Sequence, residues 1–360
     1  MKILLFGEYS GFFNCLKDGL VALGHDVFLV SDGNGYKNFP SDFRWDANTK
    51  TKLGKFKPLF GAANMWMHKN LLRGYDVVLL IAPTNFSANH IWLNKPIYEY
   101  LLKHNKKVFL SGSGISAMLF DYWYDSKEKY HYYMEGYFEE SKNPVYYHNA
   151  KLRAWEDYLM KSITGYIPIW YEYAEPFRKY KTFTKTVRIP ININQLEYKP
   201  NRLHNNKIVF YHGVNRMCKG TRFIEPAFDK MRKDYSDKAE FICARRLPFN
   251  EYMKVVERTN VIVDDANSYS IAMNGLFSLL KGKIIMGGAE PIANEEYGYE
   301  YNPVFNICPD VDQICDVIKD IISRKDEIED LGLKGRKFVE QYHDYIDIAQ
   351  QYVDIFNSFN

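Results

Sequence analysis

Short, unbroken apolar runs alternate with segments of helical periodicity along most of the chain. In the first half these runs lie at 2–6, 27–30, 76–81, 107–112 and 163–169. Between the first two, Phe12, Leu16 and Leu20 recur at the spacing of one helix face, and Gly24 ends the segment. Apolar runs without alternation are typical of parallel strands that are buried on both faces. The pattern therefore predicts βαβ units and an open parallel sheet.

The alternation breaks once and then restarts. Proline and asparagine gather between Pro190 and Asn206, where periodicity is lost, so this stretch is the predicted linker. Further strands are predicted at 186–190, 208–212, 239–243, 260–264, 283–287 and 304–308. Helices before the break are predicted at 91–104, 150–161 and near 171–180. A last helical stretch, from about 325 to 356, has too many residues for one crossover and is expected to pack back on the first domain.

These elements predict an α/β chain with two Rossmann-like, doubly wound domains. The predicted bounds are an N-terminal domain over 1–190, a linker over 191–206, a C-terminal domain over 207–335 and a C-terminal helix over 336–360 that crosses back to the N-terminal domain.

Two segments of the first half fit neither period. Residues 41–74 carry more lysine and arginine than aspartate, with aromatic residues between them. Such a surface suits an anionic membrane or a phosphorylated acceptor, but a solvated loop with aromatic residues packed beneath it is an equal alternative. The aromatic-rich segment 120–140 is interpreted as a lid or acceptor-side insertion; the alternative is a core helix with tyrosines turned outward.

Composition narrows the class of protein. With 46% apolar and 25% charged residues the chain is globular, and a net charge of +3 is too small to indicate nucleic-acid binding. An aromatic share of 16% favours a surface on which sugars stack. The five cysteines have no zinc or redox spacing, which predicts free thiols. No run approaches the ~18 apolar residues of a membrane span, and no signal peptide is evident, so we expect a cytoplasmic protein with peripheral contact to the inner membrane face.

Metal and dinucleotide chemistry are disfavoured. The histidines have no paired spacing that suits a metal site, no D-x-D motif stands out, and Asp264-Asp265 is a weak substitute for one. The first glycine loop lacks G-x-G-x-x-G, and no acidic residue closes the second strand. No metal and no cofactor are therefore expected.

The strongest chemical signal is the stretch KIVFYHGVNRMCKG, at 207–220. An apolar strand ends at Gly213, a loop carries Arg216 and Lys219, and Gly220 opens a helix. Backbone N–H groups, the positive end of the helix dipole and two cations favour a phosphate group there. A plain surface turn is the alternative. His212, at the strand end, could contact the same ligand or fill the strand end.

A second polar loop, DANSYS, follows the predicted strand at 260–264. The helix after it is predicted to begin at Ser268 or Ser270, and Asn274 is expected to be buried in it and to need a polar partner. Hydroxyl or phosphate oxygens of a ligand are one use for these groups; helix capping alone is the alternative for the serines. The candidate ligand-binding residues of this loop are Asn267, Ser268, Tyr269, Ser270 and Asn274.

Loops of the first half also follow predicted strands, where open parallel sheets place ligands. The candidate residues there are Gly7, Glu8, Gly11 and Ser113. Glu8 could contact a second substrate or act as a base, although a loop glutamate that is merely solvated is the alternative.

Taken together, the strand-G-x5-K-G-helix of 208–220, the serine-led helix and the hydrophobic strand ending in Gly287-Gly288 resemble the second domain of GT-B glycosyltransferases. More narrowly, the chain is similar to the retaining, metal-independent group 1 (family 4) enzymes. The resemblance implies that the two domains face a cleft, with an acceptor-binding N-terminal domain and a C-terminal domain for the nucleotide sugar. It also implies a glycan or lipid-linked acceptor and a role in surface polysaccharide synthesis (capsule or lipopolysaccharide).

The resemblance also assigns residues, and the chain departs from it in two places. Lys219 falls at the family's lysine, whereas Val214 stands where the family has arginine, so Arg216 would supply the second charge. Tyr269 and Phe277 stand near the positions of the family's two glutamates, and Glu290 could replace one of them. The implied catalytic residues are Arg216, Lys219 and Glu290.

Because the glutamate pair is missing, a GT-B-shaped protein that binds nucleotide sugar or glycan with little catalysis is a second hypothesis. A nucleotide-dependent oxidoreductase built from Rossmann halves is a third.

Overall fold

The computed structural model describes residues 1–33, 38–45, 56–142, 144–214, 216–245 and 249–359, with the backbone alone over 249–253. The chain divides into two compact units. Unit 1 consists of Met1–Tyr122, Val145–Asn192 and Asp344–Asn360, and unit 2 of Trp123–Pro144 and Ile193–His343. Residues 123–144, which lie within the predicted N-terminal domain, thus make their contacts mainly in unit 2.

Unit 1 is built on a six-stranded parallel sheet in the order β3-β2-β1-β4-β5-β6. Its strands are β1 (Lys2–Phe6), β2 (Asp26–Ser31), β3 (Phe43–Arg44), β4 (Val77–Leu80), β5 (Lys107–Gly112) and β6 (Gly165–Pro168). Its helices are α1 (Phe12–Ala22), α2 (Lys57–Met67), η3 (Lys69–Leu72), α3 (Ile91–His104), α6 (Ala150–Ser162), α7 (Tyr171–Ala174), η4 (Glu175–Phe177) and α14 (Tyr345–Ser358). The central strands are buried on both faces, as their apolar sequences predict.

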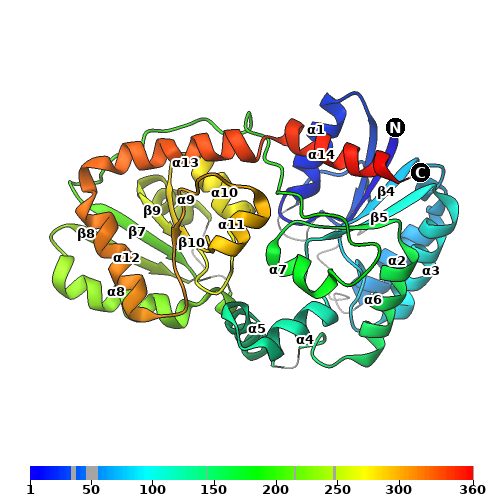
Figure 1. Ribbon diagram of the computed structural model, residues 1–360, viewed down its shortest axis with the longest axis horizontal. Coiled ribbons are helices and arrows are strands. Elements are labelled where there is room, and N and C mark those ends of the chain that lie inside the picture. Colours follow the sequence, from blue (N-terminus) through cyan, green and yellow to red (C-terminus); the bar gives the residue numbers. More distant parts are fainter. Residues whose placement is uncertain (34–37, 46–55, 143, 215, 246–248, 360) are drawn as a thin grey trace. The chain divides into compact units, whose positions relative to one another are not determined.

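Unit 2 holds a second parallel sheet, in the order β11-β10-β9-β7-β8. Its strands are β7 (Ile208–Gly213), β8 (Ala239–Ala244), β9 (Val261–Val263), β10 (Ile284–Gly287) and β11 (Phe305–Asn306). Its helices are α5 (Lys129–Ser141), η5 (Met217–Lys219), α8 (Thr221–Tyr235), α9 (Phe249–Arg258), α10 (Met273–Leu280), α11 (Pro291–Tyr297), α12 (Val311–Ser323), η6 (Lys325–Glu327) and α13 (Ile328–Tyr342). Figure 1 shows helices flanking both sheets. The predicted pair of Rossmann-like sheets is confirmed.

The C-terminal region returns to unit 1, as predicted, but not as one helix. Helix α13 ends at Tyr342, and the Asp344 side chain accepts hydrogen bonds from Ile346 N and Asp347 N to cap a new helix, α14. Helix α14 packs on α1, where a Cβ at Gly19 would lie 2.2 Å from the Tyr345 carbonyl oxygen. Glycine is therefore required at this contact.

Two further predictions of secondary structure need correction. Residues 186–190 form no strand, although Val187 N donates to Pro168 O at 2.9 Å. The helix predicted near 171–180 shortens to α7 and η4, because Pro176 has no N–H to continue it. The segment 120–140, for which a helix was the alternative, is helical: it contains most of α4 (Ala117–Ser126) and α5, separated at Lys127, whose φ is 62°.

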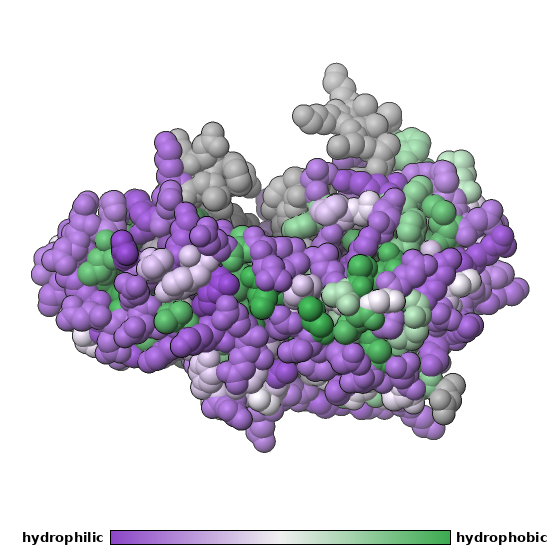
Figure 2. All heavy atoms as spheres, turned by 90° about the horizontal axis from the view of Figure 1, so that it is seen from above, coloured by the Kyte–Doolittle hydropathy of each residue, from purple (hydrophilic) through white to green (hydrophobic). Residues whose placement is uncertain are grey.

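The exposed surface is mostly hydrophilic, with hydrophobic side chains in small groups on the face that Figure 2 shows. Among the described residues, no helix has the length and apolar character needed to cross a membrane. All five cysteines are free thiols, as predicted. Residues 46–55 of the basic and aromatic segment lie outside the described residues.

Candidate functional site

The candidate donor-site residues of the second half gather in unit 2, where β7, β9 and β10 end. Strand β7 pairs with β8 on one side and β9 on the other, so the chain changes direction across the sheet at this strand. Open parallel sheets bind ligands at the carboxyl ends of their strands, at such a switch point. The loops after β7, β9 and β10 form this candidate site.

The loop after β7 has the form expected of an anion site. Gly220 adopts a left-handed conformation with φ of 81° and opens the 15-residue helix α8, which has no side-chain cap. A Cβ at Gly220 would lie 2.9 Å from the Ala266 Cβ, so the two loops approach too closely for another residue. The uncapped N-terminus of α8 therefore presents backbone N–H groups and a positive dipole end.

Lys219 lies directly before this helix but already has an anionic partner. Its ammonium group is 2.5 Å from Asp264 Oδ1, at the end of β9. Burial lowers the pKa of Lys219, but the charges of Asp264 and Asp265 outweigh this and raise it, so the side chain is charged. Burial, and then repulsion by Asp264, raise the pKa of Asp265 to about 7.

Arg216 faces α5. Its Nε lies 3.8 Å from Glu140 Oε2, and its guanidinium lies 5.1 Å from the centre of the Tyr137 ring. Both cations of the predicted phosphate loop are thus neutralised by carboxylates of unit 2. A diphosphate would have to compete with Asp264 and Glu140 for them.

His212 is completely buried, and both ring nitrogens have partners. Nδ1 donates to Val263 O at 2.8 Å, and Nε2 lies 2.9 Å from Thr221 Oγ1. Burial lowers the pKa of His212, so the ring is neutral near pH 7. The ring fills the strand end, and its role in donor binding stays a prediction.

The polar loop after β9 is longer than predicted. Helix α10 begins at Met273, because the Asp265 carboxylate accepts from Asn267 N at 2.8 Å and the chain stays irregular, with bends, up to Ala272. A helix start at Ser268 or Ser270 is therefore wrong. Asn274 is exposed, so its predicted burial is wrong as well.

The side chains of this loop are held inside unit 2. Asn267 Nδ2 donates to Cys218 O at 2.7 Å, whereas Oδ1 is buried and has no partner among the described residues. Ser270 Oγ lies 2.9 Å from the Tyr297 hydroxyl. Ser268 is buried, and its Oγ accepts from Ser270 N at 3.4 Å. Asn267 Oδ1 is therefore a buried acceptor that the described part of the chain leaves without a donor.

Gly288, directly after β10, must also be a glycine for steric reasons. A Cβ at Gly288 would lie 2.4 Å from Ser268 O and 2.6 Å from Ser270 N. The backbone of the polar loop therefore rests directly on this glycine. Gly213, in contrast, has ordinary backbone dihedrals, and a Cβ there would lie 3.0 Å from the Tyr211 hydroxyl.

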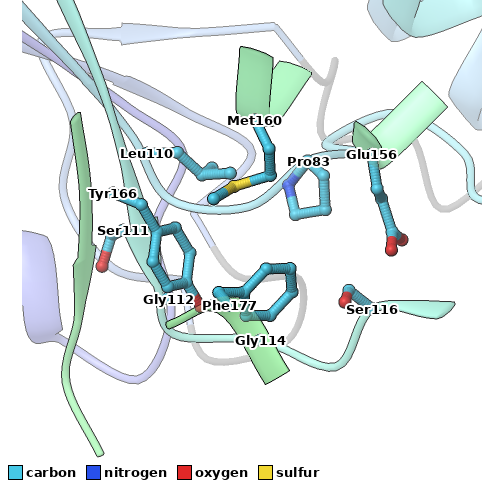
Figure 3. Close-up of a pocket in the computed structure, with 10 residues that line it drawn as sticks. All are labelled: Pro83, Leu110, Ser111, Gly112, Gly114, Ser116, Glu156, Met160, Tyr166 and Phe177. Atoms are coloured by element: carbon cyan, nitrogen blue, oxygen red, sulfur yellow. The ribbon is translucent and has the colours of Figure 1, made fainter. Parts of the chain in front are cut away.

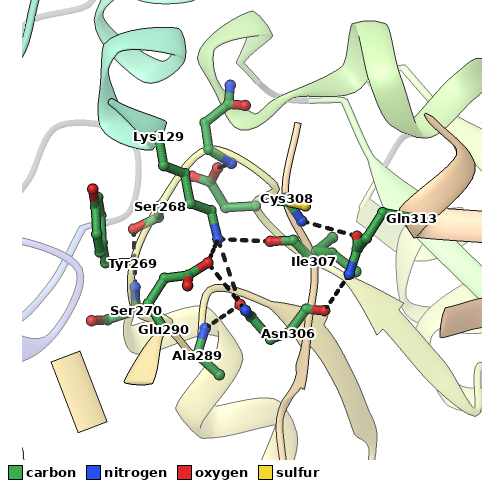
Figure 4. A network of polar contacts seen from close by, with 12 residues as sticks. Lys129, Ser268, Tyr269, Ser270, Ala289, Glu290, Asn306, Ile307, Cys308 and Gln313 are labelled. Carbon is green, nitrogen blue, oxygen red and sulfur yellow. Dashed lines mark hydrogen bonds and ion pairs between the residues drawn. The ribbon is translucent and has the colours of Figure 1, made fainter. Parts of the chain in front are cut away.

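Glu290 follows the glycine pair and lies in a network of polar contacts (Figure 4). Its Oε1 accepts from Lys129 Nζ at 2.6 Å and from Asn306 Nδ2 at 3.1 Å. Lys129 is the first residue of α5 and comes from the first half of the sequence. Beside it, the Tyr269 hydroxyl donates to Glu128 Oε2 at 3.0 Å, and the Tyr269 ring lies 5.6 Å from that of Trp123.

The α5 residues are the part of the site that the sequence did not predict. The mixture of tyrosines and charges in 120–140 marks an unusual segment, but its spacing does not say on which sheet the segment packs. A Cβ at Gly136 would lie 2.7 Å from Cys218 Cα, so α5 lies directly on η5. Among the described residues, no cluster of three or more metal-ligating side chains is found.

The acceptor-side candidates lie in unit 1, at the ends of β1 and β5. Glu8 is buried, and its carboxylate accepts from Gly11 N at 2.7 Å and from Asn14 N at 2.9 Å. Burial raises the pKa of Glu8. A merely solvated Glu8 is therefore wrong: the side chain closes the loop between Gly7 (φ of 103°) and α1. Ser113 Oγ donates to Ile81 O at 2.6 Å.

A small cavity lies beyond the end of β5 in unit 1 (Figure 3). Its volume of about 20 Å³ suffices for a single water molecule and for no substrate. Glu156, on its wall, accepts from Ala117 N at 2.8 Å and from Met118 N at 2.9 Å, at the start of α4. Burial raises the pKa of this carboxyl to about 7.

Comparison with known proteins identifies the fold. No family model and no curated protein matches the chain. HepE from Anabaena, in complex with UDP and glucose, is 12% identical with a TM-score of 0.62, over 99% of this chain and 100% of that chain. Sucrose-phosphate synthase from Thermosynechococcus elongatus is 12% identical with a TM-score of 0.65, over 99% of each chain. The lipopolysaccharide outer core galactosyltransferase WaaB is 10% identical with a TM-score of 0.52, over 99% of this chain and 100% of that chain.

At such low identity the likeness shows the fold alone. The chain has the fold of GT-B glycosyltransferases, as its sequence predicts.

Proposed function

We propose that this protein is a retaining glycosyltransferase of the group 1 (family 4) kind, which moves a sugar from a nucleotide diphosphate sugar to a hydroxyl acceptor. The observation that carries the proposal is the strand-loop-helix at the end of β7, where Lys219 precedes the left-handed Gly220 and the uncapped start of α8. HepE, which has this fold, was solved with UDP and with UDP-glucose, and this supports the same class of donor here.

In the proposed reaction the catalytic task is to stabilise the negative charge that develops on the leaving diphosphate. As the bond between the anomeric carbon and the diphosphate breaks, negative charge grows on the diphosphate. Arg216, Lys219 and the N–H groups at the start of α8 would stabilise that charge without a metal ion. The further donor contacts in this proposal are Gly213, Gly220, His212, Asn267, Ser268, Tyr269, Ser270 and Asn274, with Glu290 on sugar or ribose hydroxyls. Gly7, Glu8, Gly11 and Ser113 would lie on the acceptor side.

A second candidate is a nucleotide-sugar or glycan-binding protein with little catalysis. Tyr269 stands near a position where the family has a glutamate, and its hydroxyl is bonded to Glu128 within unit 2. Turnover, and not binding, separates the two candidates.

The cellular setting is part of the same proposal. An acceptor in surface polysaccharide synthesis, a glycan or a lipid-linked sugar, would place the protein in the cytoplasm, at the inner face of the membrane. Helix α2 supports this setting, because several of its large apolar side chains are exposed beside lysines.

The first test is a binding screen. Calorimetry and thermal shift against the diphosphates of uridine, guanosine, adenosine and cytidine, and their sugars, should identify one base. Lys219→Ala should weaken that binding by about tenfold or more, because a charge-assisted hydrogen bond is worth about 1.5–3 kcal/mol. Lys233→Ala removes an exposed lysine near the other end of α8, the helix that Lys219 precedes; it is the matched control and should leave affinity unchanged.

The outcomes are separable. No binding by any nucleotide overturns the donor site, provided that the purified protein unfolds cooperatively. Binding with neither hydrolysis nor transfer from the bound sugar favours the second candidate. Transfer that persists in excess chelator supports the metal-independent mechanism, and loss of transfer on chelation contradicts it.

A further inference from the structure

The carboxylate of Glu290 is held in an asymmetric way. Its Oε1 accepts two hydrogen bonds, from Lys129 Nζ at 2.6 Å and from Asn306 Nδ2 at 3.1 Å. None of the described residues donates to Oε2, although the side chain is only 22% exposed. One oxygen is thus fixed, and the other is left to accept a hydrogen bond from a ligand hydroxyl.

Lys129 is fixed more firmly than a surface lysine. Its side chain is 10% exposed, and Nζ also donates to Ile307 O at 2.7 Å and lies 3.5 Å from Asn306 Oδ1. Asn306 is held in turn, since its Oδ1 accepts from Ala289 N at 2.9 Å and its backbone oxygen accepts from Gln313 Nε2 at 3.0 Å. The ammonium therefore has three acceptors in one arrangement (Figure 4).

We infer that Lys129 is a positioning residue of the donor site, which fixes Glu290 Oε1 so that Oε2 faces the hydroxyls of the donor sugar. Its positive charge also balances Glu290. An unbalanced carboxylate beside a diphosphate would repel it, and the loss would be largest in this partly desolvated site. The inference rests on the proposed function, and it makes α5 a part of the sugar subsite.

The competing explanation is that the Lys129–Glu290 pair only attaches α5 to the ends of β10 and β11. In that case loss of the pair would lower the affinity for every ligand equally, because α5 is misplaced, or would change no affinity. A role at the sugar predicts a selective effect. The ratio of affinities for the nucleotide sugar and for the bare nucleoside diphosphate separates the two explanations.

The test measures that ratio for the full chain by calorimetry. Lys129→Met should lower the affinity for the nucleotide sugar about tenfold and change that for the nucleoside diphosphate less than about twofold. Lys129→Arg, which keeps the charge, should recover part of the loss. Glu290→Gln should lower the same affinity, and the double variant should be no worse than the poorer single one. Lys233→Met is the control.

Equal weakening of both ligands, or no change in either, overturns the inference. If Lys129→Met does not fold, the inference is tested on Glu290→Gln and Lys129→Arg, with the same ratio of affinities for the nucleotide sugar and the nucleoside diphosphate. If the wild-type chain binds no nucleotide at all, the proposed function falls and this inference falls with it. If the wild type binds the nucleotide, but Lys129→Met weakens the binding of nucleotide sugar and nucleoside diphosphate equally, only this inference is overturned and the proposed function stands.

Discussion

At the scale of single residues, the structure places charged groups in pairs that the sequence does not reveal. Spacing predicts that Lys219 follows a strand, but not that its ammonium contacts Asp264, which lies on another strand end. The same holds for Glu290, whose partner Lys129 is far away in the sequence. Local pattern fixes which loop a residue occupies, whereas its charge partner depends on how strands are ordered in the sheet.

Glu156 gives a prediction at this scale. Its ordinary pKa of 4.5 is raised to about 7 in the folded protein, chiefly because burial penalises the charged form. Between these pH values the unfolded chain releases the proton first, so the free energy of unfolding should fall as pH rises, by up to about 3 kcal/mol. Glu156→Gln removes the titration and should flatten this fall.

The measurement is urea unfolding of both proteins between about pH 5 and pH 7. The glutamine side chain has one acceptor oxygen for the two N–H groups at the start of α4, so the variant should be less stable than the wild type at every pH. The result that matters is the slope of the free energy of unfolding against pH. Glu99→Gln, at a half-exposed position on α3, is the control. Parallel pH profiles for wild type and Glu156→Gln would disprove the assigned pKa.

At the scale of elements, α5 is the least predictable part of the fold. Its residues fit neither helical nor strand periodicity well, because both of its faces are used: Tyr130 and Met134 are buried, while Glu135 forms an ion pair with Arg222. The start of α10 was missed for a different reason. Ser268 and Ser270 look like helix caps, but their loop is held by Asp265 and Gly288.

Gly136 tests the packing of α5 on η5. Alanine in a helix interior usually stabilises by about 0.5–1 kcal/mol relative to glycine. Here the added Cβ would lie 2.7 Å from Cys218 Cα, and backbone cannot move aside as a flexible side chain can. The cost of overpacking should therefore exceed the gain in helix propensity, and Gly136→Ala should lower the free energy of chemical unfolding by about 1–3 kcal/mol.

Ser141→Ala, at the exposed end of α5, is the matched control and should differ from wild type by less than about 0.5 kcal/mol. A Gly136→Ala variant that is as stable as wild type, or more stable, would show that α5 does not lie as closely on η5 as the structure has it.

At the scale of the whole molecule, the sequence predicts the two sheets well. Buried parallel strands read as continuous apolar runs, such as Leu4–Phe6 and Ile284–Met286, and these were found within a residue or two. The pattern does not show in which of the two units a helix packs. Residues 123–144 follow strands of unit 1 and make their contacts in unit 2, and the chain returns to unit 1 only after His343.

The last prediction concerns how the whole protein meets a membrane. The exposed apolar side chains of α2 and the residue before it are Phe56, Leu59, Phe60, Trp66 and Met67, between 41% and 73% exposed. Lysines and an arginine accompany them, and no acidic residue occurs over 56–73. An apolar face rimmed by cations fits a bilayer with anionic headgroups, where each cation near the surface adds about 1 kcal/mol.

The protein should therefore sediment with phosphatidylcholine vesicles that contain phosphatidylglycerol, and much less with phosphatidylcholine alone or at high salt. Phe60→Ser with Trp66→Ser should reduce binding to both kinds of vesicle, because burial of apolar area is lost; Lys57→Glu with Lys69→Glu should abolish only the preference for anionic lipid. Ile292→Ser, which removes an equally exposed apolar residue from unit 2, is the control. Binding that survives both double variants would place the membrane contact elsewhere than on α2.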